Sequence, residues 1–295
     1  MEERGWQIWI DRGGTFTDIL AKPPRGRLLA HKLLSENPAT TEDPTLAGIR
    51  AVTGLGPADD LRAAPIQSVT LGTTVGTNAL LERSGAATVF ITTKGFGDVL
   101  RIGTQDRPRL FARKILLPEP LAAWVIEVTE RVSFDGKILA QLDEEAARDA
   151  LAAAREAGAT AAAIALVHGW LFPSHERRLA ELAREAGFGH VSVSHETSPL
   201  QRLVPRGNTT VADAYLSPKL RTYVESVAAG LGPEVRLLCM QSNGGLAAAD
   251  RFRGKDSVLS GPAGGVVAAA RLSARAGHRR VVGFDMGGTS TDVCH

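Results

Sequence analysis

Residues that suit phosphate and magnesium chemistry occur near both ends of the chain at the same spacing. DRGGTFTDI covers residues 11–19 and FDMGGTSTDV covers residues 284–293, so Asp, Gly, Gly, Thr, Thr and Asp recur in the same order. Glycine lets the backbone approach a ligand closely, and successive N–H groups in a tight turn bind anions. Threonine hydroxyls add donors, and a carboxylate can hold hydrated Mg²⁺ that bridges to phosphate oxygens.

The pattern assigns a role to each residue type. We expect Asp11 and Asp285 to be catalytic, as metal ligands that also position water, while for Asp18 and Asp292 a ligand role and a local cap on the turn stay open. The residues expected to bind the phosphates are Gly13, Gly14, Thr15, Thr17, Gly287, Gly288, Thr289 and Thr291.

An ordinary hairpin turn would explain one isolated copy, since Gly-Gly with neighbouring Thr and Asp favours turns. Two copies, each after an apolar β-rich stretch, indicate one structural device used once in each half of a duplicated fold.

Alternating helix and strand signals must position these residues, and they predict an α/β fold. The expected helices are 143–158 with Asp143 as N-cap and Gly158 as C-cap, 174–187 with Ser174 as cap, and one that begins with Ser217 as cap and Pro218 in its first turn. The expected strands are 161–167, 190–196 and 235–240, and a glycine-rich loop near residue 260 opens into a further helix. The Pro-, Arg- and Gly-containing segment 198–208 marks the predicted domain boundary.

Several other polar residues have two interpretations. In SGPAGGVV, the glycines serve either an anion site at a helix start or close helix packing. Thr73, Thr74, Thr77 and Asn78 follow a predicted strand and serve substrate binding or helix capping. His168 is expected to be a satisfied core histidine. Arg101, Arg107 and Arg206 can each hold a carboxylate, but a surface or structural role explains each one alone.

Composition narrows the class of protein. The chain has 295 residues, 44% of them apolar and 22% charged, with a net charge of +2. This near-neutral balance argues against nucleic acid and membrane surfaces as partners. Two distant cysteines without metal-ligand spacing, and no apolar leader, lead us to expect a cytoplasmic protein. Walker A, G-x-G-x-x-G and G-x-S-x-G strings are absent from the sequence.

The paired motifs resemble the phosphate loops of the actin/Hsp70/sugar-kinase ATPases, which have duplicated ribonuclease-H-like lobes. More narrowly, the chain resembles the amino-terminal part of the ATP-dependent 5-oxoprolinase and hydantoinase A family. The blocks that carry this resemblance are WIDRGGTFTDI, LGTTVGTNALLERSGA, TTKGFGDVLRIGTQDRP, VPRGNTTVADAYLSP, MQSNGGL, LSGPAGGVV and GFDMGGTSTDV. RIGTQDRPRLF and LVPRGNTTVADAYLSP favour the oxoprolinase branch over the hydantoinase and acetone-carboxylase branches.

The resemblance implies ATP and Mg²⁺ as cofactors, nucleotide contact by Gly264 and Gly265, and a cyclic amide, 5-oxoproline above all, as substrate. It implies residues 1–200 as an amino-terminal domain with the first loop, and 205–295 as the start of a core domain with the second. Alternatives are a hydantoinase or ketone-carboxylase ATPase subunit, or a truncated, non-enzymatic nucleotide-binding module. We expect a homo-oligomer.

The chain stops two residues after the second motif, where the family continues. The final strand would then leave unpaired backbone at an open edge. We therefore expect a truncated second lobe, completed by the remainder of the family chain or by a partner subunit, and a chain that is inactive by itself.

Overall fold

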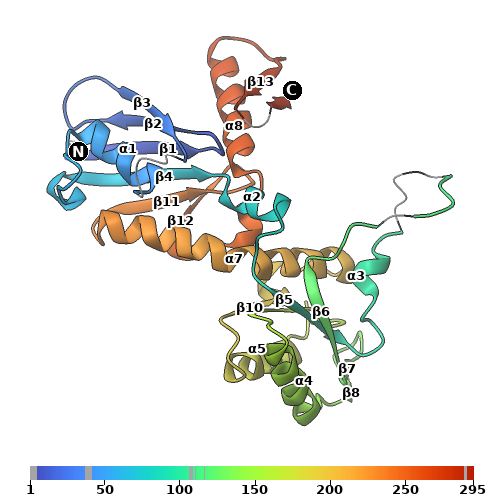
Figure 1. Ribbon diagram of the computed structural model, residues 1–295. Helices are drawn as coiled ribbons and strands as arrows, with labels where there is room; N and C mark the ends of the chain where they lie inside the picture. The colour runs from blue at the N-terminus through green and yellow to red at the C-terminus, as the bar shows by residue number, and fades with distance from the viewer. Residues whose placement is uncertain (1–4, 37–41, 106–108, 110, 116, 289–290) are drawn as a thin grey trace. The chain divides into compact units, whose positions relative to one another are not determined.

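The computed structural model describes residues 5–36, 42–105, 109, 111–115, 117–288 and 291–295. It has the predicted mixed α/β fold and divides into two compact units (Figure 1). The first comprises residues up to Glu82 and from Leu220 onward, and the second comprises Arg83–Lys219. Among the described helices, none has the length and apolar character needed to cross a membrane.

The first unit is built on a six-stranded sheet with the order β12-β11-β4-β1-β2-β3. Pairing is antiparallel for β1–β2, β2–β3 and β11–β12, and parallel for β1–β4 and β4–β11. The strands are β1 (Trp6–Arg12), β2 (Phe16–Lys22), β3 (Leu29–Leu34), β4 (Ile66–Thr73), β11 (Arg236–Met240) and β12 (Leu246–Ala248).

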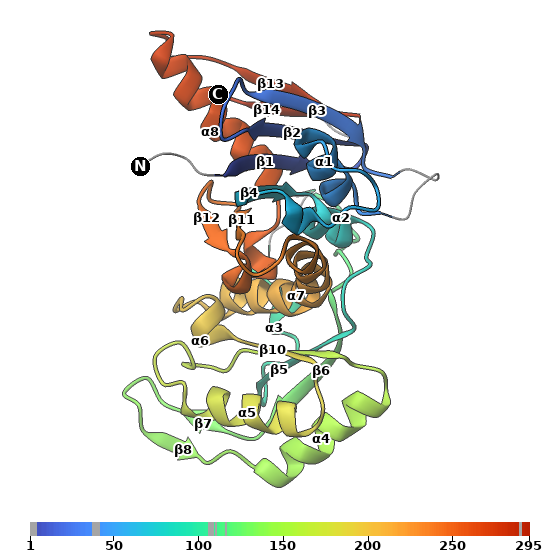
Figure 2. The ribbon, with the colours of Figure 1, turned by 90° about the vertical axis from the view of Figure 1, so that its left-hand side faces the viewer.

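Helices lie on both faces of this sheet (Figure 2). Buried Ile8 and Ile10 of β1 share a core with Ile49 of α1 (Pro44–Thr53) and with Val224 of α7 (Leu203–Leu231). Helix α8 (Ser260–Arg275) lies over the opposite face, and a separate hairpin, β13 (Gly283–Met286) with β14 (Thr291–Cys294), follows it. The remaining helical segments are α2 (Val75–Leu81) and the 3₁₀ turns Leu61–Ala63, Ala249–Arg251 and Gly254–Asp256.

The second unit is built on a parallel sheet with the order β10-β9-β5-β6. Its apolar core lies between one face of this sheet and helices α4 and α5, while α7 residues Val211 and Ala214 pack on the other face. The strands of this sheet are β5 (Thr88–Thr93), β6 (Ala122–Val128), β9 (Ala161–Ile164) and β10 (His190–Val193), while β7 (Arg131–Val132) and β8 (Ile138–Ala140) form a separate antiparallel pair. The helices are α3 (Val99–Ile102), α4 (Glu144–Glu156), α5 (Ser174–Glu185), α6 (Ser194–Thr197) and the first part of α7.

The N-cap predicted for α4 is confirmed, since Asp143 accepts the Ala146 N–H. The C-cap is Ala157, and the predicted Gly158 follows it with a φ of +102°. Strand β9 covers only the first part of the predicted segment 161–167, and β11 matches the strand predicted at 235–240.

Four local predictions are wrong. Ser174 is the first residue of α5 rather than its cap, because Pro173 occupies that position without a side-chain bond. The strand predicted at 190–196 ends at Val193, since the Ser194 hydroxyl and the His195 amide bond to Glu176 and α6 begins there.

The third concerns Pro218, which lies inside one long helix rather than at a helix start. Buried residues on both sides of it, Val211 and Val224 among them, pack into cores, and this packing outweighs the backbone hydrogen bond that proline removes. The fourth is the loop near residue 260: α8 begins at Ser260, so its glycines are helical.

The compact units divide the chain elsewhere than at the boundary predicted near 198–208. Residues 83–219 are inserted between β4 and β11 of the first sheet, and α7 crosses from the second unit into the first. The division into domains 1–200 and 205–295 stays a prediction about the family's domains.

Candidate functional site

The repeated motif forms the same β-hairpin twice. In the first copy Asp11 pairs with Asp18 and Arg12 with Thr17, and in the second copy Asp285 pairs with Asp292 and Met286 with Thr291. The two copies therefore share strand register as well as sequence. Each places one aspartate at the end of its first strand and another directly opposite on the second.

The first loop is held closed by hydrogen bonds to its own strand and to Ser35. Gly13 N donates to Phe16 O at 3.0 Å, and Ser35 Oγ donates to Gly13 O at 2.7 Å. Ser35 N also donates to Thr15 O at 2.9 Å. Thr17 is fully buried and its hydroxyl lies 3.0 Å from Ser35 Oγ, so in this arrangement it supports the loop.

Three charged residues lie side by side across the sheet, on the face toward α8. Strand register places Lys32 beside Asp18, Asp18 beside Asp11, and Asp11 beside Gly72. Lys32 Nζ lies 2.8 Å from both carboxylate oxygens of Asp18. A methyl group at Gly72 would lie 3.1 Å from Asp11 Oδ1, so the absence of a side chain there leaves room for that carboxylate.

The pKa of Asp11 lies above the ordinary aspartate value. The largest cause is partial removal of solvent by the surrounding protein, followed by the negative charges of Asp18 and Asp285, while Lys32 acts in the opposite direction. Both carboxylates lie beside the start of α8: a methyl group at Gly261 would lie 3.8 Å from Asp11 Oδ1, and one at Gly265 would lie 4.0 Å from Asp285 Oδ2. The carboxylates at this point outnumber the cation beside them, and a bound cation would relieve the excess.

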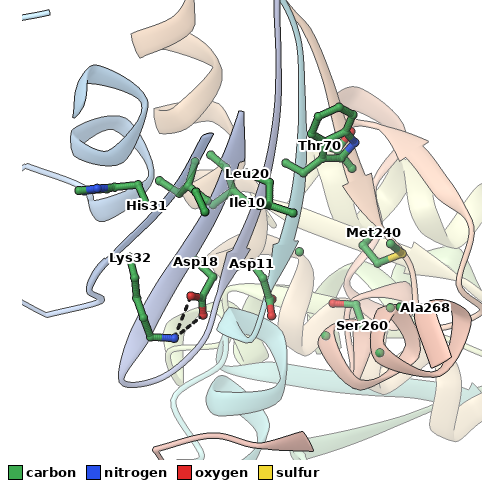
Figure 3. Close-up of a pocket in the computed structure, with 17 residues that line it drawn as sticks. Ile10, Asp11, Asp18, Leu20, His31, Lys32, Thr70, Met240, Ser260 and Ala268 are labelled. Carbon is green, nitrogen blue, oxygen red and sulfur yellow. Dashed lines mark hydrogen bonds and ion pairs between the residues drawn. The ribbon is translucent and has the colours of Figure 1, made fainter. Parts of the chain in front are cut away.

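A cavity of about 490 Å³ lies between this face of the sheet and α8 (Figure 3). Asp11 and Asp18 line it from the sheet, and Ser260 lines it from the start of α8. Further along α8, Gly264 and Gly265 also line it, so the predicted nucleotide glycines reach the same space as Asp11. The other lining side chains are mostly apolar and include Trp9, Leu20 and Met240.

The two hairpin loops meet. A methyl group at Gly288 would lie 2.8 Å from Thr15 Oγ1 and 2.9 Å from its Cβ, so this approach requires glycine at position 288. Gly287 and Gly288 are exposed at the turn, and Thr291 begins β14. Thr289 lies outside the described residues.

Hydrogen bonds from the end of β4 and from α2 hold the start of α8 beside the cavity. The Thr77 hydroxyl accepts the Leu259 N–H at 3.0 Å, and Ser260 Oγ donates to Thr73 O at 3.0 Å. Thr73 Oγ1 accepts the Val75 N–H at 3.2 Å, which is a helix-start contact of the capping kind. These bonds connect the start of α2 to the start of α8.

The arginine and histidine candidates from the sequence belong to the second unit. Arg206 is fully buried, and its guanidinium donates to Glu176 at 3.3 Å and to Leu166 O at 2.7 Å, so its role is structural. His168 Nδ1 lies 2.8 Å from Val132 O, so this ring nitrogen has a partner, but the residue is half-buried rather than in the core. Arg101 is exposed on α3, and Arg107 lies outside the described residues.

Sequence reasoning missed Lys32 and the apolar lining of the cavity. The alternation of β3 could have placed Lys32 on the face of Asp18, but β3 carried no motif. In the described part of the chain, no group of three or more His, Cys, Asp or Glu side chains is arranged to hold a metal ion.

Comparison with known proteins gives two family matches. The model described as the hydantoinase/oxoprolinase N-terminal region matches residues 7–187, and the hydantoinase/oxoprolinase model matches residues 206–295.

The chain is 37% identical to the 5-oxoprolinase of Saccharomyces cerevisiae over 99% of its own length and 26% of that protein. It thus spans about a quarter of the length of this relative.

Two solved structures share the fold. A nucleotide-free acetone carboxylase is 24% identical, with a TM-score of 0.85 over 98% of this chain and 43% of that one. The ATP-dependent caprolactamase of Pseudomonas jessenii is 31% identical, with a TM-score of 0.77 over 97% of this chain and 43% of that one.

Proposed function

Because the chain belongs to the hydantoinase/oxoprolinase family, we propose that it supplies the phosphate-binding hairpins of an ATP-dependent cyclic-amide hydrolase. The single observation that carries the proposal is the pair of matched hairpins, whose loops meet at Thr15 and Gly288 and whose aspartates Asp11 and Asp285 both lie beside the start of α8. Two hairpin loops that lie against each other can contact a polyphosphate from both sides.

The donor set fits hydrated Mg²⁺. This ion takes one or two carboxylates and keeps several waters, so it does not need a cage of three protein ligands. The raised pKa of Asp11, caused by burial and by neighbouring carboxylates, marks a place where added positive charge stabilises the site. When bound with ATP, the ion would neutralise charge on the transferring phosphoryl group. Asp11 and Asp285 are the residues proposed to hold it through water or directly.

The proposed chemistry follows from the stability of the amide bond. A lactam is resonance-stabilised, so water attacks it slowly at neutral pH. Transfer of the γ-phosphoryl group to the lactam oxygen leaves ADP and makes the ring carbon more electrophilic. Water then adds to that carbon and the ring C–N bond breaks, which leaves the amine and an acyl phosphate. A second water hydrolyses the acyl phosphate, so that inorganic phosphate and the amino acid are released. In such a reaction, the protein mainly positions groups and neutralises charge.

The preferred substrate is 5-oxoproline, because the relatives named 5-oxoprolinases match nearly the whole chain. A second candidate is a larger neutral lactam, favoured by the caprolactamase subunit alpha of Pseudomonas jessenii, which is 33% identical over 99% of this chain. The apolar cavity suits the methylene groups of either ring.

We also propose that further protein packs against the second hairpin, as the rest of the family chain or as another subunit. Apolar side chains of the hairpin are bare in the described chain: Phe284 is 67% exposed, Met286 73% and Val293 63%. Apolar residues gathered in this way mark an interaction surface.

The test is turnover by the full-length protein. With 5-oxoproline and Mg-ATP, glutamate and ADP should appear in equal amounts. Caprolactam, hydantoin and acetone with bicarbonate, run in parallel, separate the substrate branches. ATP hydrolysis at the same rate with and without every one of these compounds would contradict the assignment.

A further inference from the structure

Arg12 is adjacent to Asp11, but its side chain lies on the opposite face of the sheet. Successive residues of a strand point to opposite faces, so Asp11 faces the cavity under α8 while Arg12 points toward α1 and α7. There, Arg12 Nη1 lies 2.8 Å from Asp43 Oδ2, and the guanidinium carbon lies 4.7 Å from the centre of the Tyr223 ring.

The partners of Arg12 are themselves fixed. Asp43 caps α1, since its Oδ1 accepts the Thr45 N–H at 2.8 Å. Tyr223 OH lies 2.9 Å from the hydroxyl of Thr45, which is fully buried. Its neighbour Val224 belongs to the core of the first unit. The arginine is thus tied to two helices that the core holds in place.

The backbone of Arg12 is also held. Its carbonyl accepts the Thr74 N–H at 3.1 Å, and the Thr74 hydroxyl lies 3.2 Å away. The residue that opens the first loop is therefore fixed through its carbonyl by the loop after β4, and through its side chain by α1 and α7.

Among the described residues, the second copy of the motif shows no such tether. Met286 occupies the position of Arg12 and is 73% exposed. The hairpin and its register form without the arginine, so the shared motif does not require it. Arg12 has a separate task.

We propose that Arg12 is a positioning residue. Through its contacts with Asp43 and Tyr223 on the face opposite the cavity, it holds loop 12–16 in the conformation that binds the phosphates of ATP. This inference rests on the proposed function. Arg12 itself does not touch the nucleotide, because its side chain is held on the far face. A displacement of about 1 Å in a positioning group can cost about 100-fold in rate, so a loop released from this tether should bind ATP poorly.

The experiment compares Arg12→Met, which installs the residue of the second copy, with the unsubstituted full-length protein. We expect the KM for ATP to rise about tenfold or more, with the KM for 5-oxoproline unchanged, at temperatures where both proteins are folded. Arg12→Lys keeps a charge for Asp43 and loses the planar stack over Tyr223, so it should restore part of the ATP affinity.

Arg50→Met is the matched control. Arg50 lies on α1, the helix that Asp43 caps, and pairs with Glu42 at 2.6 Å with similar exposure. Its described hydrogen bonds go to Glu42, Gly56 and Asp59, and not to loop 12–16. It should lower the melting temperature without changing the KM for ATP. An unchanged KM for ATP in Arg12→Met, or an equal rise in Arg50→Met, would overturn the inference.

If Arg12→Met does not fold, Tyr223→Leu tests the same contact, because it removes the ring and leaves the arginine in place. A native KM for ATP in that variant counts against the tether, and a raised KM supports it. An unsubstituted protein that neither binds nor hydrolyses ATP is a different result, and it contradicts the proposed function itself.

Discussion

The two hairpins have the same sequence motif and the same register, yet their surroundings differ completely. The first lies inside a six-stranded sheet, where Ile10 is 4% exposed and Ile19 is 1% exposed. The second forms a two-stranded sheet of its own, where the equivalent Phe284 and Val293 are 67% and 63% exposed. The motif therefore determines the turn and the positions of its aspartates, and the rest of the chain determines how firmly that turn is held.

The largest expected effect tests this difference in burial. Ile10→Ala should lower the free energy of unfolding by about 3 kcal/mol, because it leaves a cavity in a packed core. Phe284→Ala, at the equivalent position, should change it by less than about 0.5 kcal/mol in the 295-residue chain. Urea titrations of both variants measure the difference. Equal losses would show that the second hairpin is as well packed as the first.

The next prediction concerns the aspartates that the hairpins share. Asp11→Asn should reduce ATP turnover of the full-length protein about 100-fold, because a positioned charge at the phosphoryl group is lost. Asp285→Asn should have an effect of the same order if both hairpins flank one metal-nucleotide complex. Single-turnover kinetics at saturating Mg²⁺ measures both. Native turnover in Asp285→Asn would restrict the site to the first hairpin.

A smaller effect is expected where the loops meet. Gly288→Ala places a methyl group 2.8 Å from Thr15 Oγ1, so one loop must move. We expect about a tenfold loss of Mg-ATP affinity by calorimetry. Because Thr15 is itself a proposed phosphate ligand, the reference for the double variant is Thr15→Gly alone. Adding Gly288→Ala to that reference should cost much less than about tenfold, since the obstructing side chain is gone. An undiminished loss would mean that the two loops do not depend on each other.

The smallest expected effect is a shift with pH. The folded pKa of Asp11 is raised, through burial first and then through Asp18 and Asp285. The folded state therefore binds the Asp11 proton more tightly than the unfolded state, and this residue's contribution to stability falls as pH rises from the unfolded pKa through the folded one. The ionised form that would serve Mg²⁺ also forms at higher pH than in an ordinary aspartate.

Asp18→Asn removes one of the causes of this raised pKa. It should move the acid limb of Mg-ATP binding to lower pH, which calorimetry over a pH series detects. Asp292→Asn, at the matched position of the second hairpin, is the control. A shift toward higher pH in Asp18→Asn would contradict the assigned role of its charge.

The sequence predicted the α/β class, the repeat, and the helix that Asp143 begins, because these depend on local spacing and on capping. Predictions from the sequence were wrong where contacts with distant residues determine the local structure. Pro218 carries a local signal for a helix start, but buried residues on both sides continue the helix through it. Ser194 carries a strand signal, but Glu176 draws it into a helix.

The candidate site divides in the same way. Asp11, Gly264 and Gly265 were predicted, and they line one cavity. Lys32 was not, because only the pairing of β3 with β2 brings it to Asp18. In the sequence, Arg12 differs from Met286 at the same position of the second copy, but its contacts could not be predicted. Its partners Asp43 and Tyr223 come from distant parts of the chain.

The insertion of residues 83–219 between β4 and β11 also bears on the order in which the protein folds. The inserted unit begins and ends side by side: Ala86 N donates to Tyr215 O at 2.9 Å, and Lys219 Nζ lies 2.7 Å from Ser84 Oγ. Once folded, it spans the gap between β4 and β11 as a short loop would, and most of the entropy cost of closing a long loop is removed. Since the amino-terminal segments leave the ribosome first, the inserted unit can be complete before β11 is synthesised. If the inserted unit folds first, the pairing of β11 with β4 then closes only the equivalent of a short loop.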